Sequence, residues 1–513
     1  MRGATLATAI AGLAITSACG DGDRAETPTR ATTPNTSLDA SSSSSGADAS
    51  TVAHATTGAD EDSADATTAT TSQETTSGLS PDLGDSSTGE ASGTSTGDAG
   101  DTGTEGSTAG GEPPPPGLPV CVAVAQPCPG SNDDNLVRHG GLVSGDRCQF
   151  ELEDQGTWAN NAAILDAIAN TVPEFDISTV IADTNRVGAA VTAAEPALSK
   201  LVGLHQAFKW DATDTSVLHW MPQGMSGSWD AAPDGLVGGR QVVAVSWYHK
   251  PEETDTPGLN KGVRVAFADV TDLDEGAVPY RHVLLVEPFM DGNQPSYRAI
   301  KIHAGGIAWT GRYLYVTDTV KGLRVFDTAR LLKMTNLEDR VGYSAETQQY
   351  HGYGYTYVLP QVGAYYLSDP SCWHRFSSVS FDRTSNPPSL ITGEYYAEHI
   401  AAKVIRWPLD GEAMLGSAEA PTSVHPMEVF FHQEKIIQGA ASSNGRWWLS
   451  AGAQLNMSAV LFRTGEDAPS DAFPWVFGPE DLMYVHGQDI LWSASEFANK
   501  RYVWSVAVGG YPQ

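Results

Sequence analysis

The stretch HAGGIAWTGRYLYVTDTVKGLRVFD, residues 303–327, carries the pattern on which the rest of the chain is built. It opens with a glycine-rich segment, and two runs that alternate polar and apolar side chains follow at 312–317 and 323–327. A turn containing glycine precedes each run, at 310–311 and at 321–322. Period-two alternation interrupted by glycine turns predicts short antiparallel strands joined as a meander.

Imperfect copies of this unit occur on both sides of it. The strands expected in the other copies are 223–230, 241–247 and 263–269; 376–382, 390–396 and 403–409; 437–443, 446–450 and 459–463; and 481–486, 490–494 and 502–506. Most copies carry a fourth candidate strand, at 283–287, 355–359, 428–431 and 475–477. The last copy lacks one, which the earlier candidates 201–209 or 217–221 would supply.

Repeats of about 40 to 80 residues, each a four-stranded meander, are typical of a β-propeller. We therefore predict an all-β fold, a β-propeller over residues 201–513. The copies favour five blades, with six as the alternative. Radial packing of the blades would leave only short strand edges exposed, and an N-terminal strand in the last blade would fasten the ring.

The first 19 residues have the features of an export signal. Arg2 is followed by an apolar run at 4–15 and then by Thr-Ser-Ala-Cys at 16–19. The run is too short to span a bilayer, whereas a basic start and small residues before a cut site are typical of signal peptides. The cysteine after small residues resembles the lipobox of bacterial lipoproteins, which implies lipidation of Cys19. We expect a lipoprotein of the outer membrane or cell surface, with plain secretion as the alternative.

Residues 20–117 are predicted to be a disordered linker. They contain no Phe, Trp or Tyr, and their 17 acidic and 2 basic residues leave a balance of −15. So little apolar surface cannot offset the entropy of ordering the chain. A flexible linker of this length reaches about 50–60 Å, enough to hold a folded domain away from a membrane. The whole chain carries a net charge of −32, which gives no electrostatic reason to bind nucleic acid or anionic lipid.

Residues 118–200 are predicted to form a small N-terminal cap on the propeller. A helix is expected at 158–172, because apolar residues fall near one face and Pro173 follows. In an exported chain the four cysteines of the folded part suggest disulfides. Of the possible pairings we favour Cys121 with Cys128 and Cys148 with Cys372, with free buried thiols as the alternative.

Aligning the copies brings one polar residue from each to the rim of the central channel. In a propeller the first strand of each blade lines the channel, so the start of each first strand faces the same mouth. The residues at that position are Gln223, His303, Arg375, Gln438 and Glu480. Such a ring is a ligand-site hypothesis, in which His303 would titrate near neutral pH. The alternative is a water-filled channel whose polar groups bind only water.

Enzyme motifs are scarce, so the sequence leaves open whether the protein is an enzyme. A glycosidase needs carboxylates on different inner strands, but Glu480 and Asp481 lie in one copy, and Asp230 and Asp382 lie at the far ends of their strands. A lactonase-like metal site would need several oxygen ligands at one mouth. We find no nucleophile elbow, phosphate loop or dinucleotide fingerprint, and we predict no metal and no cofactor.

The runs VAVSWY at 243–248, KGVRV at 261–265, YRHVLLV at 280–286 and HAGGIAW at 303–309 resemble a family of uncharacterised exported, β-propeller-like proteins of actinomycetes and myxobacteria. The resemblance implies export and a repeat β fold, and it brings no established activity. We predict a monomeric cell-envelope lipoprotein whose propeller binds a glycan, a peptide or an envelope protein. The alternative is a secreted hydrolase, a glycosidase or lactonase-like enzyme, that uses the polar mouth.

Overall fold

The computed structural model describes residue 121 and residues 141–254, 258–368, 372–397, 401–410, 414–416, 422–452, 459–466 and 468–512. The predicted signal peptide with Cys19 and the predicted linker at 20–117 lie outside the described residues. The chain divides into two units, Met1–Gly20 with Pro114–Gln513 and Asp21–Pro113, and the described residues all belong to the first. Within the described part, no helix is long and apolar enough to cross a membrane.

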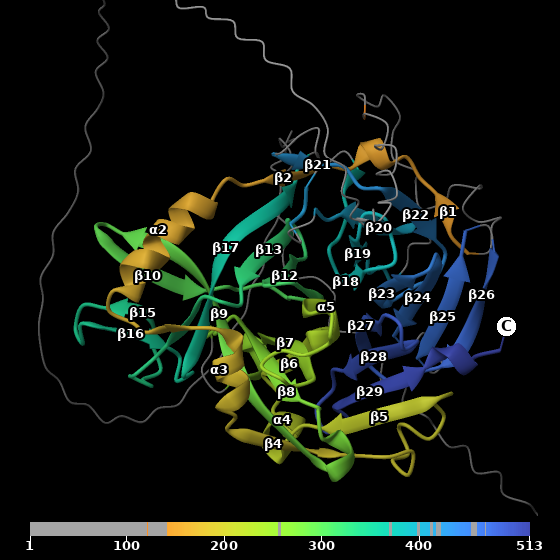
Figure 1. Ribbon diagram of the computed structural model, residues 1–513, viewed down its shortest axis with the longest axis horizontal. Coiled ribbons are helices and arrows are strands. Elements are labelled where there is room, and N and C mark those ends of the chain that lie inside the picture. The colour runs from red at the N-terminus through yellow and green to blue at the C-terminus, as the bar shows by residue number, and fades with distance from the viewer. Residues whose placement is uncertain are drawn as a thin grey trace, which may run out of the picture. The chain divides into compact units, whose positions relative to one another are not determined.

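Strands dominate the fold, and most of them pair with their neighbours in sequence as antiparallel meanders (Figure 1). Each meander is named here after its first strand. The β6 meander consists of β6 (Trp220–Gly227), β7 (Val242–His249), β8 (Val263–Asp269) and β9 (Ala277–Asp291). The β11 meander consists of β11 (Ile307–Thr310), β12 (Tyr313–Asp318), β13 (Gly322–Asp327) and β17 (Tyr357–Leu367).

The C-terminal part of the chain repeats the arrangement. The β18 meander consists of β18 (Ser378–Asp382), β19 (Ser389–Gly393), β20 (Ala402–Pro408) and β22 (Glu428–His432). The β23 meander consists of β23 (Ile437–Ser443), β24 (Arg446–Ala451), β25 (Val460–Gly465) and β26 (Ala468–Pro474). The β27 meander consists of β27 (Pro479–Val485), β28 (Ile490–Ser495), β29 (Tyr502–Ala507) and, as its outer strand, β5 (Leu204–Lys209).

The first strands of these meanders lie around a common centre. Strand β6 contacts β11 and β27, β11 contacts β18, and β23 contacts both β18 and β27. Strand β18 also contacts β27 and β6, so each first strand touches the first strands of at least two other meanders. The later strands lie outward from them (Figure 1). This radial order is that of a β-propeller, as the sequence predicts. The N-terminal strand β5 completes the β27 meander, which joins the two ends of the folded chain.

Glycines allow the first strands to approach one another closely. A Cβ atom on Gly306 would run into the backbone nitrogen of Val379 in β18, and one on Gly224 would lie 2.6 Å from the carbonyl carbon of Gly306. A Cβ atom on Gly439 would lie 2.8 Å from the Cα atom of Asp481. The Gly-Gly pair of the opening stretch is thus required by strand packing at the centre.

The core lies between the meanders. Along β7, Val242 and Ala244 face a cluster shared with the β11 meander, including Ile307 and Trp309. The alternate residues Val243, Val245 and Trp247 face a cluster shared with the β27 meander. Both faces of such a strand are buried, which is why the sequence of β7 is almost continuously apolar.

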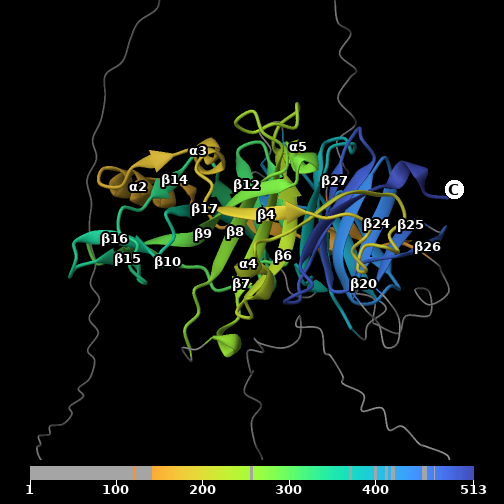
Figure 2. The same cartoon turned by 90° about the horizontal axis from the view of Figure 1, so that it is seen from below.

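Helix α2 (Trp158–Ala169) contacts β17, β9 and β10 (Gln294–Ala299) at one side of the domain (Figure 2). Leu165 and Ile168 are fully buried, and Trp158 packs edge-on against Tyr313 and Tyr365. The helix ends earlier than predicted, before the turn that leads to Pro173. Burial of this apolar face fixes the helix against the outer strands of the propeller.

Several short elements complete the domain. The helices are α3 (Ile177–Ala182), α4 (Ala212–Ser216), α5 (Ser228–Ala231), η1 (Arg147–Gln149), η2 (Pro251–Glu253), η3 (Leu273–Glu275) and η5 (Val508–Gly510). The strands are β1 (Val143–Ser144), β2 (Leu152–Asp154), β3 (Glu174–Phe175), β4 (Arg186–Ala190), β14 (Leu331–Lys333), β15 (Val341–Ser344), β16 (Gln349–Gly352) and β21 (Ser423–Val424). Strand β4 pairs with both β5 and β9 and thereby links two meanders.

Some predicted strand positions are wrong. The outer strand of the β23 meander is β26, not 475–477, since Trp475 and Val476 are buried core residues beyond its end. The residues of β26 are all at least partly exposed and include two prolines, so apolar alternation does not reveal this edge strand. The segment 217–221 supplies no outer strand either, because its end begins β6.

The predicted disulfide pairing is also wrong. Cys121 is bonded to Cys148, with 5.2 Å between their Cα atoms, and Cys372 is disulfide-bonded as well. Cys128 lies outside the described residues. Cys148 sits in η1, where Asp146 accepts a hydrogen bond from its backbone nitrogen at 2.9 Å. Sequence spacing cannot reveal such a pairing, because the fold decides which cysteines meet.

Candidate functional site

One end of the ring gathers the starts of the first strands and the ends of the second strands, since the two run antiparallel. We call this end the mouth and define it by His303, Arg375, Gln438 and Glu480. His303 precedes β11 and Arg375 precedes β18, whereas Gln438 and Glu480 lie at the starts of β23 and β27. The mouth is the place where the sequence alignment puts its candidate residues.

His303 and Arg375 belong to different meanders, and the charge of Arg375 acts on His303. The imidazole of His303 lies against the ring of Tyr248, with 4.3 Å between the ring centroids. Burial, together with the positive charge of Arg375, lowers the pKa of His303 to about 4. His303 is therefore neutral at pH 7, and the expectation that it titrates near neutral pH is wrong.

Arg375 is half-buried and is positioned by a buried carboxylate. Its backbone nitrogen donates to Oε1 of Glu394 at 2.8 Å, and its guanidinium lies 6.0 Å from the ring centroid of Tyr395. The other oxygen of Glu394 lies 2.7 Å from Nζ of Lys403. Burial raises the pKa of Glu394 in spite of this lysine. Glu394 thus orients the loop that carries Arg375.

Gln438 and Glu480 form a second pair at the mouth. Nε2 of Gln438 donates to Oε1 of Glu480 at 3.4 Å, and both side chains are buried. Glu480 also shares a hydrogen bond with Glu496. Burial and the neighbouring carboxyl group raise the pKa of Glu480 well above its usual value, and burial raises that of Glu496 to about 7. The two carboxyl groups therefore hold a proton at neutral pH.

Gln223, the fifth residue of the predicted ring, is buried within β6. Its Nε2 donates to the carbonyl oxygen of Pro222 at 2.9 Å, and the residue is completely buried. Its Oε1 has no hydrogen-bond partner within the described residues. Gln223 lies on β6 near the same end of the ring as the other four residues.

Sequence reasoning misses two acids of the mouth, Glu394 and Glu496. Each follows directly after a second strand, at Gly393-Glu394 and Ser495-Glu496. An antiparallel neighbour ends where the first strand begins, so the residue after each second strand reaches the same mouth. A search of those positions as well as the first strands would have found both acids.

The remaining acids at the centre have structural partners. Oδ2 of Asp481 accepts from the backbone nitrogens of Met225 at 3.1 Å and Ile307 at 3.2 Å, which ties three first strands together. Asp230 accepts from the hydroxyl of Ser226 at 3.0 Å, and burial raises its pKa to about 8. Asp382 forms a buried ion pair of 2.8 Å with Arg406.

Two further sequence features have structural contacts of their own. Trp309 of β11 packs edge-on against Phe267 of β8, and Trp229 of α5 stacks on Trp492 of β28, so both rings make packing contacts between elements. In the acidic turn at 269–275, Asp272 pairs with Arg240 at 3.1 Å, and both side chains are exposed. No group of three or more His, Cys, Asp or Glu residues suited to a metal ion occurs within the described ranges.

Comparisons with known proteins place this chain in no family. No family model matches it, and no curated protein does. Among solved structures, RS223-β-xylosidase is similar at 11% identity over 56% of this chain and 91% of its own, with a TM-score of 0.24. The Cps50 (Swd1) β-propeller domain of Myceliophteria thermophila is similar at 10% identity over 56% of this chain and 96% of its own, with a TM-score of 0.23. Both TM-scores are below 0.5, so neither similarity indicates a function for this chain.

Proposed function

We propose that this protein is an exported lipoprotein whose β-propeller has five blades and binds a ligand at its mouth. The strand pairings support five blades, because the β6, β11, β18, β23 and β27 meanders each contribute four strands. Strand β5 supports closure of the ring by the N-terminal part of the domain. In this proposal the segment around α2 is a cap on the outer strands.

The observation that carries the binding proposal is the meeting of Tyr248, His303 and Arg375. They come from β7 and from the loops before β11 and β18, and all three are half-buried. Together they present an aromatic face, a neutral imidazole and a fixed positive charge. This combination suits a polar ligand that carries a carboxylate, such as an acidic glycan or an acidic peptide of the envelope.

Glycan and peptide arrays probed with the exported chain test this function. We expect a bound class enriched in carboxylates, with binding lost in His303→Ala and in Arg375→Gln. His205→Ala is the matched control, because His205 is exposed on β5 and lies outside the mouth. Equal binding by the control and both mouth variants would place the ligand elsewhere on the protein.

A hydrolase that uses the mouth is the second candidate, and the Glu480–Glu496 pair favours it. A carboxyl group that stays protonated at neutral pH is what a general acid requires. Both residues are only 1% exposed, so a substrate would have to reach a buried pair. Turnover of a compound in a glycoside or lactone panel, lost in Glu480→Gln, would support a hydrolase. If no compound in the panel is turned over, binding without catalysis is favoured.

The proposed lipid anchor rests on the lipobox-like sequence that ends at Cys19. We expect radiolabelled palmitate to be incorporated into the full chain and to be absent from the Cys19→Ala variant. The variant should then leave the membrane fraction and appear in the medium. Label retained in Cys19→Ala would contradict the proposal.

A further inference from the structure

A second candidate site lies away from the mouth, in a cavity of about 240 Å³. Its walls come from β4, β8, β9 and the turn before β17. The charged side chains that line it are Arg186, Arg264 and Arg281, and His282 lies among them. Three arginines from three different strands thus share one small cavity.

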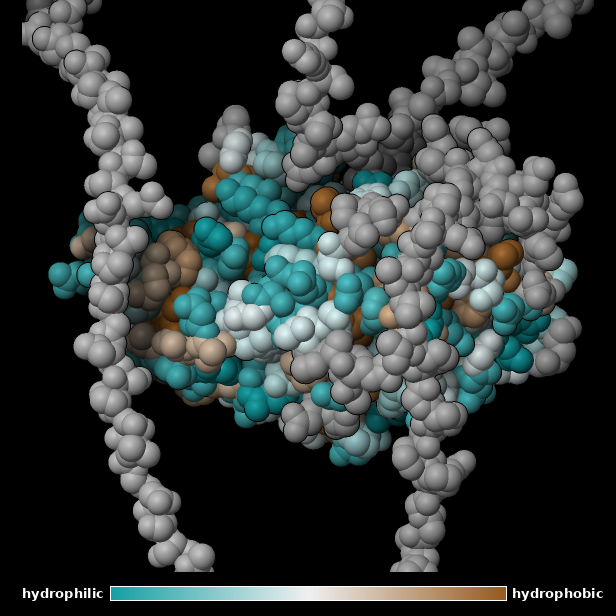
Figure 3. Space-filling model, turned by 90° about the horizontal axis from the view of Figure 1, so that it is seen from above, coloured by the Kyte–Doolittle hydropathy of each residue, from teal (hydrophilic) through white to brown (hydrophobic). Residues whose placement is uncertain are grey.

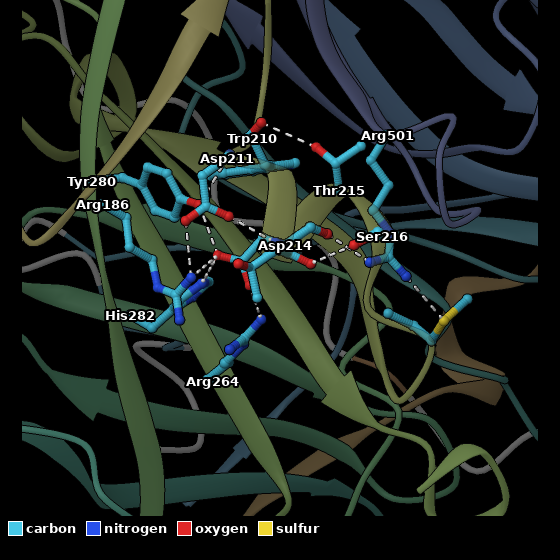
Figure 4. A network of polar contacts seen from close by, with 12 residues as sticks. Arg186, Trp210, Asp211, Asp214, Thr215, Ser216, Arg264, Tyr280, His282 and Arg501 are labelled. Carbon is cyan, nitrogen blue, oxygen red and sulfur yellow. Dashed lines mark hydrogen bonds and ion pairs between the residues drawn. The ribbon is translucent and has the colours of Figure 1, made fainter.

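The carboxylates that balance these arginines do not line the cavity. Asp214 is buried behind it, where its Oδ1 lies 2.8 Å from Nη2 of Arg264 and its Oδ2 lies 3.1 Å from Nη1 of Arg186 (Figure 4). Asp183 lies 2.9 Å from Nη1 of Arg281. Asp211 also lies 3.0 Å from Nη1 of Arg186, and none of these three acids is among the residues that line the cavity. The charged groups that line the cavity are therefore all positive.

His282, which also lines the cavity, is a neutral hydrogen-bond partner of Asp214. Its Nε2 lies 2.9 Å from Oδ2 of Asp214, which also accepts from the hydroxyl of Tyr280 at 2.7 Å (Figure 4). Burial, aided by Arg264, lowers the pKa of His282 to about 4, so its ring is neutral at pH 7. Asp214 is thereby saturated with donors and holds the arginines in place.

The arginines keep donors that their carboxylate partners do not use. Arg186 has partners at Nη1 only within the described part of the chain, and its side chain is 29% exposed. Arg264 is 3% exposed, and its Nε has no acceptor among the described residues. A buried guanidinium donor without an acceptor is costly, so an acceptor from a ligand would stabilise this site.

Geometry favours a tetrahedral anion over a planar one. A single arginine satisfies a carboxylate through two parallel hydrogen bonds, whereas a phosphate or sulfate directs its oxygens to several sides. Here the arginines come from β4, β8 and β9, and Asn185 and the turn at 353–356 also line the cavity. The volume lies below the usual range of drug-sized pockets, about 300–1,000 Å³, which limits the rest of the ligand to a few atoms.

We propose that this arginine cavity binds a small phosphate-type oxyanion, either the free ion or the phosphate group of a small ester. The site is independent of the mouth and of any ligand bound there. Arg264, held between Asp214 and the ring of Trp220, is the fixed centre of the site. Arg186, whose side chain is 29% exposed, supplies further donors at the more exposed edge.

Titration calorimetry and thermal unfolding of the full chain test the proposal with inorganic phosphate, glycerol phosphate, sulfate and acetate. Sodium chloride at matched ionic strength is the reference. We expect saturable binding and a raised Tm with phosphate or its ester, and much weaker effects with acetate. Stronger binding of the ester than of the free ion would identify a small phosphorylated molecule as the ligand, and the reverse would identify the ion.

Arg186→Gln should weaken phosphate binding about tenfold or more, because it removes charge-assisted hydrogen bonds. The matched control is Arg298→Gln, since Arg298 is exposed and pairs with Glu287 outside the cavity. The control should bind as the parent does. No effect of phosphate beyond that of chloride, acetate binding as tightly as phosphate, or equal losses in both variants would overturn the proposal.

Discussion

The carboxyl groups of Glu480 and Glu496 are hydrogen-bonded to each other although each side chain is only 1% exposed. Two like charges cannot both be ionised at this distance in a buried site, so the pair retains a proton at neutral pH. This relationship joins the start of β27 to the end of β28 and places an acid pair at the mouth of the propeller.

The first prediction concerns the pH dependence of stability. A carboxyl group whose pKa is raised on folding binds more protons in the folded state, so its contribution to stability falls as pH rises from the unfolded pKa toward the folded one. For Glu496 that window runs from about 4.5 to about 7. The Glu496→Gln variant cannot ionise, so we expect its free energy of unfolding relative to the parent to rise between pH 5 and pH 8.

Urea unfolding at several pH values measures this difference, which we expect to reach about 1–3 kcal/mol. Comparing variant with parent removes the opposite trend of buried histidines such as His303, whose lowered pKa makes stability fall at acidic pH. A difference that is flat with pH would show that Glu496 is not held protonated by the fold.

The second prediction concerns the glycines at the centre of the ring. Gly306→Ala should destabilise the protein by about 3 kcal/mol or prevent folding, because the added methyl group meets the backbone of β18. Gly465→Ala is the control, since its Cβ atom would meet nothing within 4 Å. The free energy of unfolding of both variants can be measured by chemical unfolding. If Gly306→Ala is as stable as Gly465→Ala, the first strands can move apart to accept the methyl group.

The third prediction concerns the buried ion pair of Asp214 and Arg264. Asp214→Asn leaves the guanidinium of Arg264, whose side chain is 4% exposed, without its counter-charge. We expect a loss of about 3–5 kcal/mol in the free energy of unfolding. Asp272→Asn removes an exposed partner of Arg240 and should produce no measurable change. A small effect of Asp214→Asn would mean that water reaches this site.

The fourth prediction concerns the disulfide between Cys121 and Cys148. Peptide mapping without reduction should recover these two cysteines in one linked peptide. Replacing both by serine should lower the free energy of unfolding by about 3 kcal/mol, because the bond closes a loop with a sequence separation of 27. Recovery of a Cys121–Cys128 peptide instead would contradict the structure and restore the pairing favoured from the sequence.

The described surface is rich in hydrophilic residues, as expected for an acidic chain (Figure 3). Figure 3 shows one face of the molecule, on which the coloured surface is largely hydrophilic. Large apolar residues that are exposed, such as Val187, Leu218 and Leu337, come from separate elements. Isolated apolar residues of this kind are normal on soluble proteins, so no docking surface is inferred from them.

The sequence by itself determined the strands that are buried and the order in which they pair. Alternation and glycine turns located β8 and β23 to the residue, because each such strand must bury a periodic set of side chains between neighbours. The N-terminal strand β5 was also predictable as the partner of the last meander. The edge strand β26 was not, since none of its residues is fully buried and its sequence therefore lacks a periodic apolar set.

Only the tertiary structure decided which polar groups meet. It placed His303 against Tyr248, Glu480 against Glu496, and three arginines around one cavity. The tertiary structure also decided that Cys121 bonds to Cys148, because a disulfide depends on the distance between the two segments in space. Hydrogen bonds and ion pairs act over a few ångströms, whereas the periodic pattern of a sequence records only whether a side chain faces the core.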